Sequence, residues 1–176
     1  MNKKITIIDN TNNIRLRLAE HGDNELLRTW KNNNKRSFFY QQEISPNQQK
    51  EWFFAYQKRE NDYIFMVEEF VDLKYEPIGC MGFRVKDEEI DLYNIIRGKK
   101  SRTGASMHRA MHIMLNYILL KYDLPLKCDV LKDNPAVDWY KKCGFDILRE
   151  IEYYIMQIDK KKIEKIILKI HEEESR

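Results

Sequence analysis

The sequence predicts an α+β fold in αβα layers, with helices flanking a mixed, mostly antiparallel central sheet of six to seven strands. Two observations lead to this prediction. Three β-like segments follow one another in the first half of the chain, and helical and β-like segments alternate after them. One of the later helical segments carries a long apolar stripe, which is typical of a helix that buries one face.

The first elements are a strand and two helices. Residues 14–18 alternate apolar and basic side chains, as in a half-buried strand, and residues 23–31 form a helical stretch. A second helix starts at Ser45, which can cap it, with Pro46 in the first helical position and Gln48 completing a capping box. Three β-like segments then indicate an antiparallel meander: Tyr63–Glu68, Pro77–Val85 and Glu89–Ile96, separated by turn-rich residues 72–76 and 86–88.

The best-defined helix follows a glycine-containing loop. Its apolar stripe consists of Met107, Ala110, Met111, Met114, Leu115 and Ile118. Residues 126–131 then form a short strand, residues 134–142 a short helix, and residues 144–158 a last strand. In the tail, residues 160–176, the isoleucines 163, 166, 167 and 170 share one helical face, which predicts an amphipathic helix that packs on the sheet or on a second copy in a homodimer.

Length and composition favour one domain over residues 1–176, because a chain of this size buries enough surface without a metal or a disulfide. The cysteines Cys80, Cys128 and Cys143 are odd in number and far apart, so they form neither a disulfide set nor a zinc pattern. The formal charge of +3, from 31 basic and 28 acidic residues, gives no nucleic-acid footprint. No apolar stretch is long enough for a membrane span, and we expect a cytoplasmic protein.

Two segments carry candidate chemistry. Residues 96–106 leave a strand and enter the long helix, whose first backbone N–H groups could bind a phosphate, although glycine and serine also serve there for structural reasons alone. In residues 134–145, Asn134 and Pro135 suit a helix start and Gly144 a helix end. Spacing alone does not decide whether Tyr140 is a packed aromatic residue or a catalytic phenol.

Together, these two segments resemble the GNAT (Gcn5-related N-acetyltransferase) superfamily. Its Asn-x-x-Ala-(x3)-Tyr-(x3)-Gly-Phe motif is matched here by Asn134, Ala136 (one position early), Tyr140, Gly144 and Phe145. Its Arg/Gln-x-x-Gly-x-Gly/Ala loop is matched only in part. If the loop is aligned by the apolar stripe of the helix, Arg102 takes the basic position. If it is aligned by Gly104, no basic residue takes that position. The likeness covers nearly the whole chain. It is strongest to ribosomal-protein N-terminal and nucleotide-amino-sugar acetyltransferases, although Lys31 stands where the latter have arginine.

The resemblance implies an acetyl-CoA site and no metal. Splayed backbone at Tyr93, Asn94, Ile95 and Ile96 would hold the acetyl carbonyl and the pantetheine arm, which Asn134 and Ala136 would also contact. The pyrophosphate would bind at Lys99, Arg102, Thr103, Gly104, Ala105 and Ser106. Tyr140 would be the general acid for the departing thiolate. Glu89 and Asp91 share a strand face and are the candidate bases for a primary amine that attacks the thioester directly.

The acceptor is expected to be a small-molecule amine, first of all a nucleotide-linked amino sugar. The region from Trp30 to Phe53 would line the acceptor side of the site. Its aromatic residues could stack on a base or a sugar ring, or they could be ordinary core residues. A protein N-terminus, an antibiotic amine and a non-catalytic acyl-CoA-binding module are the alternatives. His108 and His112 lie one helical turn apart, and we expect them to be solvated rather than metal ligands.

Overall fold

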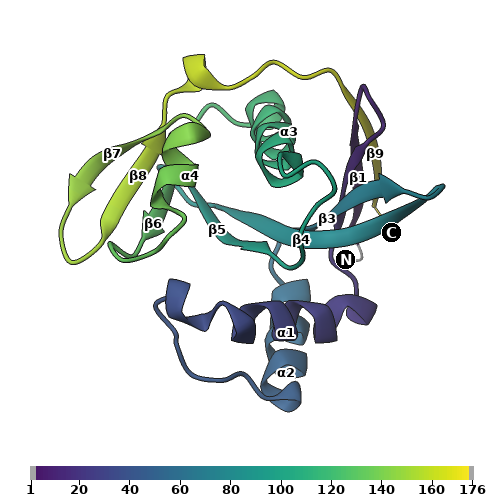
Figure 1. The fold of residues 1–176 in the computed structure, drawn as a ribbon, viewed down its shortest axis with the longest axis horizontal. Helices are drawn as coiled ribbons and strands as arrows, with labels where there is room; N and C mark the ends of the chain where they lie inside the picture. The colour runs from purple at the N-terminus through teal and green to yellow at the C-terminus, as the bar shows by residue number, and fades with distance from the viewer. Residues whose placement is uncertain (1–2, 175–176) are drawn as a thin grey trace.

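The computed structural model describes residues 3–174, whose strands form one mixed sheet (Figure 1). The strand order is β7-β8-β6-β5-β4-β3-β2-β1-β9, and only the pair β5–β6 is parallel. The strands are β1 (Lys3–Asp9), β2 (Ile14–Leu18), β3 (Asp62–Val71), β4 (Lys74–Val85), β5 (Ile90–Arg97), β6 (Leu126–Val130), β7 (Phe145–Glu150), β8 (Tyr154–Ile158) and β9 (Leu168–Glu174). The α+β prediction is confirmed, with nine strands in place of six to seven.

Helices cover both faces of the sheet. Figure 1 shows α1 and α2 on one side and α3 with α4 on the other. The α-helices are α1 (Asn24–Asn33), α2 (Pro46–Gln57), α3 (Ser106–Lys121) and α4 (Val137–Lys142), and the short 3-10 helices are η1 (His21–Asp23), η2 (Lys35–Ser37) and η3 (Lys160–Lys162). Each face has its own cluster of buried apolar side chains. Within residues 3–174, none of the helices has the length and apolar character needed to cross a membrane.

Several predicted local features are present. Ser45 accepts a hydrogen bond from the Gln48 amide and the Gln48 side chain accepts one from the Ser45 amide, so α2 has its capping box. All the residues of the predicted stripe on α3 are buried. The turn between β3 and β4 is tighter than predicted, because Asp72 and Leu73 both have positive φ, which is the geometry of a two-residue hairpin loop. Residues 144–158 form a hairpin, β7 and β8, rather than one strand.

The predicted C-terminal helix is wrong. Residues 160–162 form the short η3, and β9 pairs with β1 along its whole length at the far edge of the sheet. The isoleucine spacing fitted a helix, but β1 offers a row of unpaired backbone groups that only a strand can satisfy. Ile163 and Ile166 are buried on the way to this edge, whereas Ile167 is exposed.

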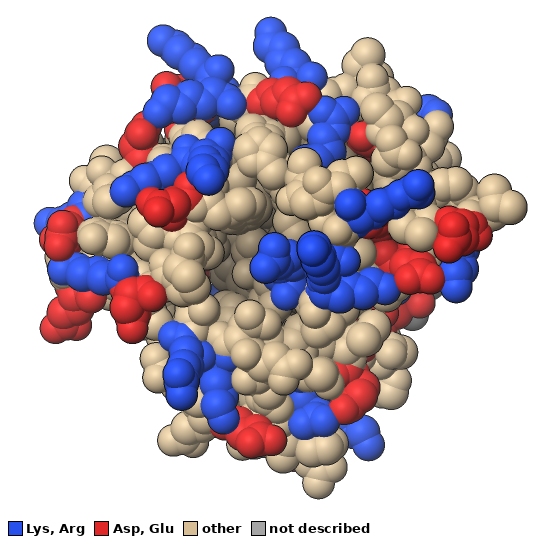
Figure 2. All heavy atoms as spheres, viewed as in Figure 1, with Lys and Arg blue, Asp and Glu red and all other residues tan. Residues whose placement is uncertain are grey.

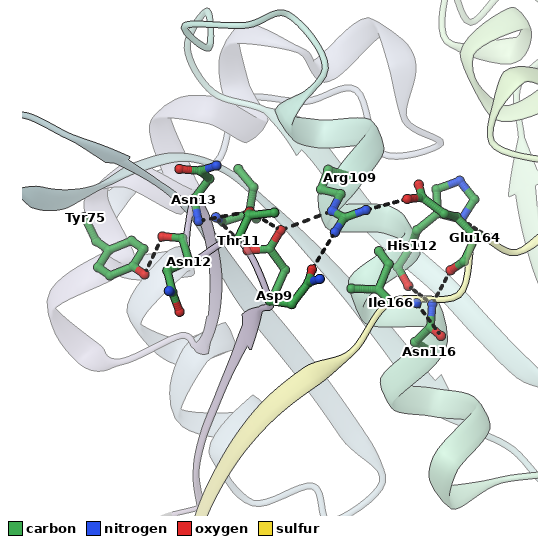
Figure 3. Close-up of polar contacts among 12 residues, drawn as sticks. Asp9, Thr11, Asn12, Asn13, Tyr75, Arg109, His112, Asn116, Glu164 and Ile166 are labelled. Atoms are coloured by element: carbon green, nitrogen blue, oxygen red, sulfur yellow. Dashed lines mark hydrogen bonds and ion pairs between the residues drawn. The ribbon is translucent and has the colours of Figure 1, made fainter.

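Polar contacts hold the segment between η3 and β9 against α3 (Figure 3). Arg109 donates to the buried Asp9 carboxylate at 3.1 Å and also pairs with Glu164. His112 Nδ1 accepts a hydrogen bond from the Glu164 amide at 3.1 Å, and Asn116 donates to the Glu164 carbonyl at 2.7 Å. His112 is therefore a buried acceptor and not the solvated histidine expected from the sequence.

Candidate active site

The central feature of the site is the place where β5 and β6 part. These parallel strands pair only at Ile90–Leu126 and Asp91–Lys127. Further along, β5 contains a bulge: Gly82 of β4 faces Tyr93 and Cys80 faces Ile96, so one extra residue is inserted on β5. Asn94 lies in this bulge with φ 50°, a left-handed conformation that asparagine tolerates better than most residues. The predicted splay is therefore present: within residues 3–174, β5 beyond Asp91 has no strand partner on this side.

The space-filling view shows what lies at this gap. Figure 2 shows a hollow over the region where β5 and β6 part, with lysine and arginine atoms along one side of it. Such a distribution gives the hollow a positive border, which favours a negatively charged ligand.

The loop before α3 presents free backbone donors. The Arg102 amide donates to the buried Glu69 carboxylate at 2.9 Å, and the Ser106 hydroxyl donates to the same group at 2.6 Å. Gly104 has φ 73° and open space where a side chain would project. Among the described residues, the amides of Thr103, Gly104 and Ser106 have no protein acceptor, so they remain for an anion at the helix N-terminus.

The other loop residues predicted for this site are placed differently. The Ala105 amide donates weakly to the Thr103 hydroxyl, at 3.4 Å. The Lys99 side chain pairs with Glu76 at 2.9 Å, and the backbone amides of Gly98 and Lys99 both donate to the Ile78 carbonyl. The loop is thus fixed to β4 at its start and to β3 through Glu69, which leaves its last residues exposed.

Asn134 connects two distant segments. Its Oδ1 accepts a hydrogen bond from the Ala136 amide at 2.8 Å, and its Nδ2 donates to the Ser37 carbonyl at 3.1 Å. The turn that it forms delays α4, which begins at Val137 and not at the predicted residue 134. Gly144 ends the helix with φ 96°, as predicted. Asn134 is therefore already engaged with the protein, with one N–H and one lone pair left for a ligand.

Tyr140 is buried on α4, near Cys128 of β6. Its ring makes edge contacts with Trp139 and Phe145 at centroid distances of 5.2 and 5.7 Å. Within residues 3–174, its hydroxyl has no hydrogen-bond partner. Burial raises the pKa of Tyr140 well above its usual value, so the phenol keeps its proton and can act as a donor.

Glu89 and Asp91, the candidate bases, pair with lysines outside the cavity described below. The Glu89 carboxylate accepts a hydrogen bond from Lys127 Nζ at 2.9 Å and lies 3.4 Å from Lys86 Nζ. Lys86 Nζ also pairs with the Asp91 carboxylate at 3.2 Å. The hydrogen bond from Lys127 lowers the pKa of Glu89, which makes this carboxylate a weaker base. The structure does not bring either residue to the bulge.

A cavity of about 370 Å³ lies between α1, α2 and strands β4 and β5. Its polar lining consists of Lys31, Tyr40, Gln48, Gln49, Tyr93 and Asn94, and its apolar lining includes Trp52 and Ile96. Of the aromatic residues considered from the sequence, Tyr40 and Trp52 line the cavity, whereas Phe53 belongs to the core and Phe39 packs on Tyr153. Because the cavity reaches Asn94, it ends at the bulge.

Lys31 is the feature of this cavity that sequence reasoning did not assign to the site. Its Nζ donates to Asn94 Oδ1 at 2.8 Å and lies 3.2 Å from the centroid of the Phe38 ring. Burial lowers the pKa of Lys31 to about 8. The only signal in the sequence was that a lysine replaces the arginine usual at this position.

The comparisons with known proteins agree with this geometry. The Acetyltransferase (GNAT) domain family matches residues 13–146, about three-quarters of the chain. The chain belongs to the GNAT acetyltransferase family. It is thus an acyltransferase, and acetyl-CoA is the donor that such enzymes use. No curated protein matches the sequence.

Solved structures share the fold at low sequence identity. FdhC, described as a nucleotide-linked sugar GNAT, is 21% identical with a TM-score of 0.70, covering 86% of this chain and 89% of its own. Spermidine N-acetyltransferase from Vibrio cholerae, solved with CoA and spermine, is 19% identical with a TM-score of 0.68, covering 82% and 93%. A domain from Methanocaldococcus jannaschii is 16% identical with a TM-score of 0.69, covering 89% and 99%.

Proposed function

We propose that this GNAT acetyltransferase moves an acetyl group from acetyl-CoA to the amine of a nucleotide-linked amino sugar. The observation that carries the proposal is the meeting of two spaces at Asn94. The gap between β5 and β6 lies on one side of the bulge and the cavity under α1 and α2 lies on the other. A donor in the gap and an acceptor in the cavity would therefore meet at one point.

The donor half of the proposal rests on free hydrogen-bond donors. The unpaired amides of Thr103, Gly104 and Ser106 suit a pyrophosphate, and the open space at Gly104 permits close approach. The strand groups left free beyond Asp91 suit the amides of a pantetheine arm and the acetyl carbonyl. The protonated Tyr140 phenol is the candidate acid for the leaving thiolate.

The acceptor half rests on the charge of the cavity. Its lining has one cation, Lys31, and no carboxylate. A polyamine would meet a like charge there without a counter-charge, which is unfavourable at short range. The side-chain amides of Gln48 and Gln49 and the ring of Trp52 suit a sugar ring. The cavity volume of about 370 Å³ is within the range of small-ligand pockets and admits a sugar ring.

Titration calorimetry tests both halves. We expect saturable binding of acetyl-CoA, weakened when Gly104 is replaced by tryptophan, and separate binding of uridine or thymidine diphosphates. Tyr140→Phe should keep acetyl-CoA binding but lose about 10²–10⁴-fold in turnover with whichever amino sugar is accepted, as expected for loss of a general acid. Spermidine binding in preference to the nucleotides would contradict the acceptor assignment. Failure to bind acetyl-CoA would contradict the donor site.

A further inference from the structure

Lys31 occupies an unusual position for a lysine. It projects from α1 into the cavity, where its Nζ is fixed by Asn94 at the bulge of β5 and by the face of the Phe38 ring. Among the described residues, no carboxylate lies within ion-pair distance of it, in contrast to Lys86, Lys99 and Lys127. A half-buried amine without a counter-charge is costly to keep charged, because desolvation disfavours its charged form.

Among the residues that the structure describes, Lys31 is also the only amine in the lining of the cavity. Its partner Asn94 belongs to the strand segment that borders the gap between β5 and β6. With acetyl-CoA in the gap, as proposed above, an amine held at this point would border the thioester, as a substrate amine must for direct attack. Orientation of this kind turns a collision between two molecules into a reaction within one complex.

We propose that Lys31 is itself an acetyl acceptor, which the protein acetylates with acetyl-CoA when no substrate amine fills the cavity. This inference rests on the proposed donor site. The neutral Nζ attacks the thioester carbonyl, a C–N bond forms and the C–S bond breaks. The CoA sulfur leaves with the bonding electrons and takes one proton, from Tyr140 or water, while Nζ gives up one proton to water. The products are Nε-acetyl-Lys31 and free CoA.

The electrostatics of the site agree with this role. Because burial lowers the pKa of Lys31 to about 8, roughly a tenth of the side chain is neutral at pH 7, far more than for an ordinary lysine. Acetylation would remove the only cation of the cavity and add bulk to its lining. The modified protein should therefore bind an anionic acceptor less tightly, so the reaction would switch the enzyme off when acceptor is scarce.

Peptide mapping by mass spectrometry tests the proposal directly. The purified full-length protein is incubated with acetyl-CoA and without acceptor, and the occupancy of acetyl-lysine is measured at each position. We expect Lys31 to be acetylated at least about tenfold faster than Lys50, an exposed lysine of α2 that lies outside the cavity. The rate should rise about tenfold per pH unit below about pH 8 and then level off.

Three comparisons separate enzyme-directed transfer from simple chemical reactivity. Lys31→Arg should lose the fast acetylation, whereas Lys50→Arg should keep it. Excess CoA, which competes for the donor site, should slow acetylation of Lys31 but not that of Lys50. Acetyl phosphate, a donor without the CoA portion, should show a much smaller preference for Lys31, limited to what its lowered pKa gives. The comparisons with excess CoA and with acetyl phosphate use wild-type protein, so they do not depend on how well a variant folds.

Two outcomes would overturn the proposal, and they can be told apart. If calorimetry detects acetyl-CoA binding but Lys31 stays unmodified, or is modified no faster than Lys50, only this inference fails. If acetyl-CoA does not bind at all, the proposed function fails and the inference fails with it.

Discussion

At the residue scale, Asn94 connects two parts of the site, because its backbone forms the bulge in β5 and its side chain accepts a hydrogen bond from Lys31. The positive φ of Asn94 belongs to a region that side chains branched at Cβ rarely enter. Tyr140 also has two linked properties, because the burial that packs its ring keeps its phenol protonated. In both residues, a backbone or packing role therefore goes together with a property that the proposed chemistry uses.

Replacing Asn94 separates these two tasks. Asn94→Val should lower the free energy of unfolding by about 1–3 kcal/mol relative to Asn94→Gly, since valine is strained at this φ and glycine is not. Both variants lose the hydrogen bond to Lys31, so their difference isolates the backbone. Urea unfolding measures it. Equal stabilities would show that the strand straightens without cost and that the bulge is not held in place.

At the scale of elements, the position of α1 relative to β5 decides where the cavity lies. Gly98, just after β5, is in direct contact with Trp30 of α1: an added Cβ would lie 2.0 Å from Trp30 Cε2. Trp30 is buried in the cluster that also contains Phe53 and Ile96. The contact fixes the depth at which α1 packs, and with it the distance from Lys31 to Asn94.

Gly98→Ala tests this contact. The added methyl group must displace Trp30, and we expect a loss of about 1–3 kcal/mol in unfolding free energy together with a change in tryptophan fluorescence. Gly22→Ala is the matched control, because its Cβ would meet nothing within 4 Å. If the two variants were equally stable, α1 would not depend on close packing at Gly98.

At the scale of the whole molecule, the C-terminal segment joins the two edges of the sheet. After β8, near one edge, the chain crosses α3 and returns as β9 at the opposite edge (Figure 1). His112 holds this segment against α3, because its Nδ1 accepts a hydrogen bond from the Glu164 amide. This bond requires an unprotonated ring nitrogen. Burial, aided by the nearby His108 and Arg109, lowers the pKa of His112 below its usual 6.5.

The stability of the protein should therefore fall in mild acid. As pH drops below about 6.5, the unfolded chain binds a proton at His112 before the folded chain does, so folding is progressively disfavoured until the lowered pKa is reached. Urea unfolding between about pH 7 and pH 5 should show a steeper decline for wild type than for His112→Gln. His171→Gln, at an exposed site on β9, should decline like wild type. Parallel curves for all three would exclude His112 as the cause.

The elements of the candidate site were predictable where their residues are close in sequence. The motif from Asn134 to Phe145 located α4 and Tyr140, and the helix stripe located α3 and the loop before it. The base was assigned to Glu89 and Asp91 because they share a strand face, but a face does not reveal which lysines will neutralise it. Lys31 was passed over because its partner Asn94 lies 63 residues further along the chain.

The sequence by itself determined the elements whose signals are local: the capping box of α2, the buried stripe of α3 and the glycine that ends α4. These depend on neighbours three or four residues apart, which the chain order fixes directly. Only the tertiary structure decided the bulge at Asn94, the pairing of Glu69 with the α3 loop and the strand β9 in place of a helix. Each of these depends on register, or on a sheet edge supplied by a distant segment, and tertiary pairing of that kind overrides local spacing.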